Sequence, residues 1–330
     1  MFREILLVLI LLAAPCGAQE FPVRIDHAFG TATIPARPER VVSLSFIGHD
    51  FLLALGVKPI ALRKWYGNFP HGVWPWGEEA LGDATPVVMQ GEIDIEAIAA
   101  MKPDLIVGQW SGMTADEYRL LSQIAPTVAH RAEWGPYGAS WQDMLRVLGV
   151  STGRQARAEA EIARLESRFA QIREAHPDWR GASAAVVWAG TSGAYTSRDM
   201  RGRLLTDLGF VIPDALDARG GLNVTYARVP PEDLSDIDVD ALIWLDAGGG
   251  TDRLRTLPLR HRMRAYAEGR EIYSGLMLSA AMSHSSPLSL DRALDELVPL
   301  LEAAMDGDPA TVVTSTREAG ILDEGPTDAR

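Results

Sequence analysis

The sequence predicts an α/β protein of two lobes, each with a mainly parallel β-sheet flanked by helices, joined by a single long rigid helix. Short apolar segments alternate with helical ones, which is typical of parallel sheets. The second half repeats the plan of the first, because Glu232 precedes Asp240 of DALI by the same eight positions that separate Glu96 from Asp104 of DLIV. A long amphipathic segment lies between the two halves.

That segment, residues 151–176, is predicted to be helical because its apolar residues recur at steps of four and three. They form one narrow stripe of Ala158, Ile162, Leu165, Phe169 and Ile172. Thr152 and Gln155 predict a capping box, and Pro177 marks the end. About 24 helical residues would span roughly 36 Å. This length suits a strut between two bodies, and an ordinary long helix packed on one large domain fits the pattern equally well.

The first half begins with a polar entry segment and continues as alternating strands and helices. Strands are expected at residues 40–45, 59–63, 104–109 and 127–131, and helices at residues 49–56, 95–101 and 115–124, and residues 141–148 close the first half. The loop at residues 65–77 holds three tryptophans among Gly and Pro. Its aromatic residues either line a cleft or fold as a plug over their own lobe.

The second half is expected to contain strands at residues 184–190, 241–246 and 271–275, with helices near residues 202–208 and 287–305. The predicted organisation is therefore a leader at 1–18, an N-terminal lobe at 19–150, a bridging helix at 151–176, a C-terminal lobe at 177–306 and a flexible acidic tail at 307–330.

Composition restricts the kinds of partner. The chain has 330 residues, 47% of them hydrophobic, which is enough for substantial cores. Its formal net charge of -13 argues against a nucleic-acid or anionic-membrane partner. Only three of the 31 Lys and Arg residues are lysines, so most cationic side chains are guanidinium groups, which suit carboxylate or oxyanion recognition.

Residues 1–18 resemble a cleaved signal peptide, with Arg3, a short apolar run and small residues before Gln19. We therefore expect a periplasmic protein that begins at Gln19. Lipid anchoring at Cys16, the only cysteine, is the alternative, and Pro15 fits that signal poorly. With no other cysteine, the mature chain would contain no disulfide.

No catalytic constellation is visible. The sequence contains no P-loop, GxGxxG, GxSxG or HExxH motif, and its histidines are scattered. His49 and His284 are the two candidates for a metal or cofactor ligand. No catalytic residue and no metal site is assigned, and the chain is predicted not to be an enzyme.

Aromatic and arginine side chains recur where the predicted strands end. In open α/β sheets ligands bind at the carboxyl ends of the strands. Stacking, cation-π contacts and bidentate hydrogen bonds from such side chains suit a sizeable anionic or aromatic ligand. The predicted ligand-binding residues are Arg63, Trp65, Tyr66, Trp110, Tyr137, Trp188, Tyr195, Arg198, Trp244 and His284.

The ordered segments RVVSLS, LLALGVKPI, IDIEAIAAMKPDLIV and SSPLSLDRALDEL resemble the periplasmic solute-binding proteins of ferric-siderophore and vitamin B12 ABC importers. The resemblance covers Pro38 to about Ala304. The segments VWPWGEEALGD and SGMTADEYRLLSQIAPTV are most similar to those of the iron-siderophore subgroup.

The resemblance implies a monomer that holds a ferric siderophore between its lobes with modest closure. It implies no cofactor, since iron would arrive already chelated and need no protein ligand. It also implies that Glu96 and Glu232 dock on the permease of the importer. Both glutamates are expected early in helices, where the helix dipole favours an exposed carboxylate.

Two other interpretations remain. A haem, cobalamin or metal-ion binding protein would keep the fold, and direct binding of haem or a metal ion would need protein ligands such as His49, His130 or His284. An exported α/β enzyme would need a nucleophile and a base brought together by the fold.

Overall fold

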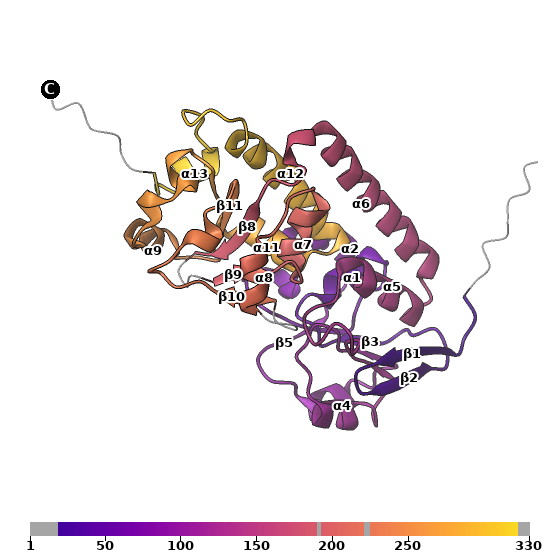
Figure 1. Cartoon of the computed structure of the whole chain (residues 1–330). Coiled ribbons are helices and arrows are strands. Elements are labelled where there is room, and N and C mark those ends of the chain that lie inside the picture. Colours follow the sequence, from indigo (N-terminus) through magenta and orange to yellow (C-terminus); the bar gives the residue numbers. More distant parts are fainter. Residues whose placement is uncertain (1–18, 190–192, 221–224, 323–330) are drawn as a thin grey trace, which may run out of the picture.

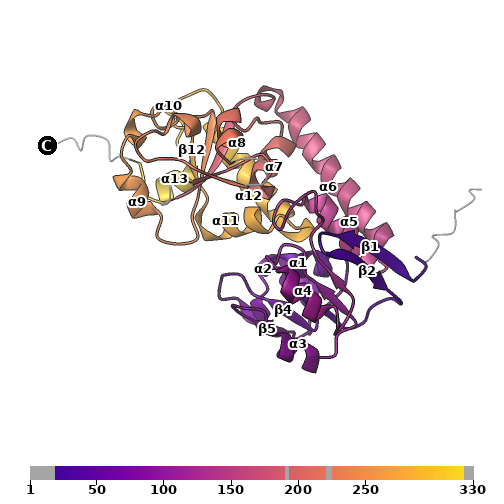
Figure 2. The same ribbon diagram turned by 60° about the horizontal axis from the view of Figure 1, so that its bottom comes forward.

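The computed structural model describes residues 19–189, 193–220 and 225–322. The predicted leader with Cys16, and the last eight residues of the predicted tail, lie outside these ranges. Two five-stranded sheets form the centres of two lobes, and α6 (Gln155–Ala175) runs from one lobe to the other along one side of the molecule (Figures 1 and 2). In the described part of the chain, every helix is too short or too polar to cross a membrane.

The first sheet is parallel throughout, in the order β5-β4-β3-β6-β7. Its strands are β3 Val41–Ser43, β4 Ala61–Arg63, β5 Val87–Met89, β6 Leu105–Val107 and β7 Thr127–Val128. The helices of this lobe are α1 Gly48–Ala54, α2 Pro75–Leu81, α3 Ile95–Ala100, α4 Ala115–Leu121 and α5 Trp141–Ser151. The helix α2 begins inside the segment that was predicted to be a loop, with Pro75 at its first position, where proline is well tolerated.

The second sheet is mixed, in the order β10-β9-β8-β11-β12. The strands β8 Ala184–Trp188, β11 Ala241–Leu245 and β12 Glu271–Tyr273 pair in parallel, and β9 Gly193–Tyr195 pairs antiparallel with both of its neighbours, β8 and β10 Tyr226–Arg228. The helices here are α7 Met200–Asp207, α8 Asp214–Gly220, α9 Thr251–Thr256, α10 Arg264–Ala267, α11 Gly275–His284, α12 Pro287–Ala304 and α13 Thr314–Glu318. The predicted fold class is confirmed.

The long helix confirms the predicted stripe and contradicts the predicted cap. Ala158, Ile162, Leu165 and Phe169 are buried, as the periodicity requires. The helix begins at Gln155 without any side-chain cap. The Thr152 hydroxyl instead donates to the carbonyl of Leu148, because the chain around it still belongs to the end of α5. The capping box was therefore wrong.

Two terminal regions are more ordered than predicted. The polar entry segment forms an antiparallel hairpin of β1 Val23–His27 and β2 Gly30–Ile34. In the predicted tail, residues 307–322 pack on the second lobe, with Val313, Thr316 and Ile321 buried. The prediction of a flexible tail is wrong for residues 307–322, because their apolar side chains, although too few to show a period, complete a neighbouring core.

The helices α11 and α12 connect the lobes a second time. The helix α11 lies at the junction of the lobes (Figure 2), and α12 starts against the first lobe and runs back beside α6. The Ser286 hydroxyl at the start of α12 donates to Asp50 of α1, and Leu288 packs on the core around Leu53 and Leu81. A ligand space between the lobes is therefore bordered by two separate connections. The lobe boundaries at 19–150 and 177–306 stay predictions.

Candidate functional site

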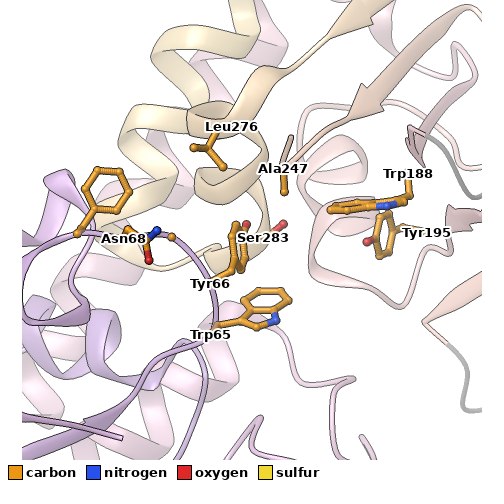
Figure 3. A pocket seen from close by; sticks show the side chains of 10 residues that line it. Trp65, Tyr66, Asn68, Trp188, Tyr195, Ala247, Leu276 and Ser283 are labelled. Atoms are coloured by element: carbon orange, nitrogen blue, oxygen red, sulfur yellow. The ribbon is translucent and has the colours of Figure 1, made fainter. Parts of the chain in front are cut away.

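A cavity of about 670 Å³ lies between the two lobes. The first lobe contributes the loop after β4, and the second lobe contributes the ends of β8 and β9, the turn after β11, and α11 (Figure 3). The side chains and backbone that line it belong to Trp65, Tyr66, Gly67, Asn68, Phe69, Trp188, Tyr195, Ala247, Leu276 and Ser283. Trp65 and Trp188 lie after or at the carboxyl ends of β4 and β8, and parallel strands direct those ends to one edge of each sheet, whereas Tyr195 lies on the antiparallel strand β9.

Aromatic rings form most of its wall. Trp65 and Tyr66 meet edge to face with ring centroids 4.8 Å apart, and they lie across the cavity from Trp188 and Tyr195 (Figure 3). Tyr66 also forms a side-chain hydrogen bond with Ser283 of α11, and burial raises the pKa of Tyr66 to about 12. The phenol is therefore neutral at physiological pH. Four of the predicted ligand-binding residues are thus brought together.

A buried polar cluster lies behind this wall. Asp50 accepts hydrogen bonds from the indole of Trp76 (2.6 Å) and from the Ser286 hydroxyl (3.1 Å). His49 and His284 are both buried, with ring centroids 6.2 Å apart, and burial lowers the pKa of each to about 4. Burial also raises the pKa of Asp50. The two histidines are therefore neutral at physiological pH, and Nδ1 of His284 lies 2.9 Å from the Ala280 carbonyl oxygen.

These histidines do not assemble a metal centre. Among the described residues, no group of three or more His, Cys, Asp and Glu side chains is arranged to hold a metal ion. The third candidate of the alternative interpretation, His130, packs edge to face on Phe29 beside the N-terminal hairpin. Trp74, which is 2% exposed and stacked on Trp76, completes the packing around His284, so for this pair the plug interpretation holds.

Arg201, which was missed, lies behind Tyr195 in the first turn of α7. Its guanidinium carbon is 3.9 Å from the centroid of the Tyr195 ring, and the side chain is only 4% exposed. It pairs with Asp199 (Nε to Oδ1, 3.2 Å), but neither Nε nor Nη1 has a hydrogen-bond acceptor among the described residues. Its charge also acts on Tyr66 and His284 across the cavity. In the sequence, the N-cap residue Asp199 was the available signal, because it begins a helix and turns the following arginine inward.

Six predicted ligand-binding residues do not line the cavity. Trp244 is a core residue, 1% exposed, whose indole donates to Glu271 (2.7 Å), so its assignment was wrong. The guanidinium of Arg63 donates to the carbonyls of Gly91 and Ser111 and stacks on a phenyl ring. Three others are Trp110, buried and bonded to a backbone carbonyl, and the exposed Tyr137 and Arg198. The sixth, His284, lies behind the aromatic wall.

The two predicted docking glutamates are both exposed. Glu96 is in the first turn of α3, whose N-cap, Asp94, accepts from a backbone N–H. Glu232 lies in a turn before the short 3₁₀ helix Ser235–Ile237, so the expectation that it begins an α-helix was wrong. The two prolines before it fix a turn in place of a regular first helical turn.

Comparisons with known proteins agree with this architecture. A family model described as periplasmic binding protein matches residues 41–274. A probable siderophore-binding lipoprotein of Bacillus subtilis, YfiY, is 31% identical over 230 residues, which make up 67% of this chain and 67% of that protein.

Two solved structures are similar over most of the chain. A periplasmic solute binding protein from Mycobacterium smegmatis matches with a TM-score of 0.76 and 34% identity, covering 86% of this chain and 98% of that one. PiaA of Streptococcus pneumoniae, solved in complex with ferrichrome, matches with a TM-score of 0.74 and 28% identity, covering 86% and 99%.

Proposed function

Because the chain belongs to the periplasmic binding protein family, we propose that it captures a ferric siderophore between its lobes and delivers it to the permease of an ABC importer. The observation that carries this proposal is the aromatic cavity between the lobes. The names of YfiY and of the ferrichrome complex of PiaA support the ligand class. On this proposal the protein is exported by its leader, binds its ligand as a monomer and catalyses no reaction.

The charge of the cavity restricts the class of ligand that it can bind. Among the described residues, no Asp, Glu, Lys, Arg or His lines it, and the masked residues 190–192 and 221–224 include no such side chain in the sequence. Arg201, a cation behind Tyr195, is paired with Asp199. Burying a multiply charged anion here would leave most of its charge uncompensated. Three hydroxamates cancel the charge of a ferric ion, whereas three catecholates leave a triple negative charge. We therefore assign a ferric trihydroxamate.

Within the cavity the side chains have distinct roles. Trp65 and Trp188 would provide apolar faces for the chelate from the two lobes. Tyr66 and Tyr195 would donate phenolic hydrogen bonds to its oxygens. A guanidinium N–H of Arg201, which has no acceptor among the residues that the structure describes, would donate to one iron-bound hydroxamate oxygen.

Tryptophan fluorescence measures this binding. The protein is titrated with a ferric trihydroxamate, a ferric tricatecholate and ferric citrate, with gallium chelates as controls for light absorption by iron. We expect saturation by the trihydroxamate at submicromolar concentration and at least tenfold weaker binding of the tricatecholate. Equal or tighter tricatecholate binding would refute the hydroxamate assignment alone. A lack of response to every chelate would refute the siderophore proposal, and a haem absorption band in the purified protein would favour haem.

Variants assign the side-chain roles. Arg201→Gln should weaken trihydroxamate binding about tenfold, the effect of one lost charge-assisted hydrogen bond. Arg198→Gln, three positions earlier and exposed, is the matched control and should bind normally. Equal affinities for the two variants would remove Arg201 from the site.

For docking, we propose that Glu96 and Glu232 contact cationic side chains of the permease, one from each lobe. The double variant Glu96→Ala, Glu232→Ala should bind its ligand normally and fail to support uptake in cells. Exposed glutamates elsewhere on the same lobes, Glu79 and Glu318, provide a control pair that should leave uptake intact. Loss of ligand binding in the docking variant would contradict the assignment.

A further inference from the structure

A second cavity, of about 410 Å³, lies at the opposite edge of the first sheet. Arg37 precedes β3 and Lys58 precedes β4, so both lie at the amino ends of strands. Trp65 and Tyr66 of the ligand cavity follow β4 at its carboxyl end. The loop between α5 and α6 closes the second cavity with Thr152 and Arg154. The two cavities are therefore separate, and both can be occupied together.

Cations collect here without counter-ions. Arg37, Lys58 and Arg154 line the cavity, and Nη1 of Arg157 would lie 2.8 Å from a Cβ placed on Gly56 of its wall. Within the described residues none of these four side chains forms an ion pair or a hydrogen bond, and Nε of Arg154 is buried without an acceptor. Burial, then repulsion from Arg37 and Arg157, lowers the pKa of Arg154.

This absence of pairing is unusual for the molecule. Neighbouring arginines on α5 and α6 are paired, as Arg146 is with Glu159 and Arg164 with Asp291. The second cavity contains a single carboxylate, Glu39, which is exposed and pairs with none of the four cations. In a chain with a net charge of -13, a local excess of positive charge is the opposite of what random placement would produce.

The N-terminus of α6 adds to the positive electrostatic potential of the second cavity. This 21-residue helix has no side-chain cap and no acidic residue in its first turn. Its free N–H groups and the positive end of its dipole therefore point toward the loop that holds Arg154. Gly56, with φ at +73°, keeps the opposite wall free of a side chain that would collide with Arg157.

We propose that this second cavity binds a phosphate group, carried either by a soluble phosphate compound or by the headgroup of an anionic phospholipid. A guanidinium group can donate two parallel hydrogen bonds to the oxygens of one phosphate, and an ammonium group adds a point charge. The cavity is large enough for a diphosphate or a phosphoglycerol group. The lipid source is relevant because the segment after the predicted leader lies here, where Gln19 bonds to the Val150 carbonyl and Phe21 lies near Gly153.

The test uses the mature chain and two probes at about 0.15 M salt. Calorimetric titration with diphosphate measures the binding of a soluble phosphate compound. Sedimentation with phosphatidylglycerol vesicles, compared with phosphatidylcholine vesicles, measures the binding of an anionic headgroup. Arg154→Gln and Lys58→Gln should each weaken binding about tenfold, as expected for one lost charged contact. Arg119→Gln, an exposed arginine of α4 paired with Asp116, is the control and should bind as wild type.

Each outcome decides the proposal. Diphosphate binding that the two cavity variants weaken supports a soluble ligand. Binding to phosphatidylglycerol vesicles alone, weakened by the same variants, supports a headgroup. If neither probe binds, or if all three variants bind as wild type, the proposal is overturned. Siderophore binding serves as the check of folding, because the ligand cavity lies at the other edge of the sheet.

Discussion

Trp188 and Trp244 occupy similar places at the ends of neighbouring parallel strands, but they have opposite roles. Trp188 is in register with Leu245, whereas Trp244 is in register with Val187. Side chains alternate across a strand, so the shift of one residue turns the two indoles to opposite faces. Trp188 reaches the cavity, and Trp244 reaches the core, where Glu271 accepts its N–H. Sequence spacing alone could not decide this, because the register depends on how β8 and β11 pair.

The Glu271 network should be important for stability and unimportant for binding. Glu271 also accepts two hydrogen bonds from Arg260, whose side chain is fully buried. Glu271→Gln leaves that guanidinium charge buried without a counter-ion, which should lower the free energy of unfolding by about 3–5 kcal/mol. Urea denaturation measures this change in the free energy of unfolding. The siderophore affinity of the Glu271→Gln variant should equal that of the wild type.

The matched control is Glu268→Gln, three positions earlier in the chain. Glu268 pairs with Arg264 and Arg270 but is 34% exposed, so its loss should cost less than about 1 kcal/mol. Similar costs for the two variants would show that the Glu271 charge is not needed to balance Arg260.

Stability should fall as the solution becomes acidic. His49 and His284 have native pKa values of about 4, below their unfolded values, so between about pH 6.5 and 4 the unfolded state binds more protons. The loss from pH 7 to 5 should be about 2 kcal/mol per histidine. Asp50, whose pKa is raised, acts in the opposite direction because its buried charge disappears as the pH falls. The positive charge of Arg201 also contributes to the lowered pKa of His284.

Urea denaturation across this pH range measures how steeply the free energy of unfolding falls with pH. His284→Met should remove about half of the loss, since one of the two buried imidazoles is gone. His71→Asn, at an exposed position with φ of +56°, should leave the slope unchanged, because Asn tolerates that backbone. An unchanged slope in His284→Met would mean that this histidine is not the source.

At the scale of elements, the helices α6 and α12 are held together by charge. Asp291 of α12 accepts from both Arg164 (2.8 and 3.0 Å) and Arg168 (2.6 Å) of α6. Asp291→Ala should cost about 1–2 kcal/mol, more than a single exposed pair because two arginines lose a shared partner. The cost should shrink at high salt. Denaturation at low and high salt measures it.

Glu296→Ala tests whether the bridge between helices matters or only the number of ion pairs. Glu296 pairs with Arg292 within α12, so its removal should cost about 0.5 kcal/mol or less. If the two variants lose the same free energy, then the bridge contributes nothing beyond an ordinary helical pair.

The elements that the sequence predicted are those with a visible period. The stripe of α6 and the alternation that produces the first sheet were both correct. The helix α11 was missed because all its residues from Leu278 to His284 are buried, so no polar face gives the helical period. The N-terminal hairpin was missed because its two strands have only five residues each, and two of the buried positions hold His27 and the small Ala32, so few large apolar residues mark the alternation.

At the scale of the whole molecule, the two connections between the lobes predict small motion on ligand binding. The helix α6 runs between the lobes, while α12 packs on α1 and α2 at one end and lies beside α6. We expect the radius of gyration to change by less than about 1 Å when the siderophore binds. Solution scattering with and without ligand measures it, and a decrease of several ångströms would contradict the rigid arrangement.

The site was predictable only in part because it forms between the lobes. Strand ends selected Trp65, Tyr66, Trp188 and Tyr195, which all line the cavity, and their contact with a ligand stays a prediction. Arg201 could not be selected in the same way, since its place depends on how α7 packs against Tyr195 of β9. A single sequence gives each lobe its pattern but carries little information about how the two are placed.

The hydrogen bond from Ser286 to Asp50 joins residues 236 positions apart. The contacts of the first lobe with the start of α12 therefore form only after almost the whole chain has been made. Contacts so distant in sequence form late and slowly. On the proposed export of the chain, this delay would keep the first lobe incompletely folded until the last helices had arrived.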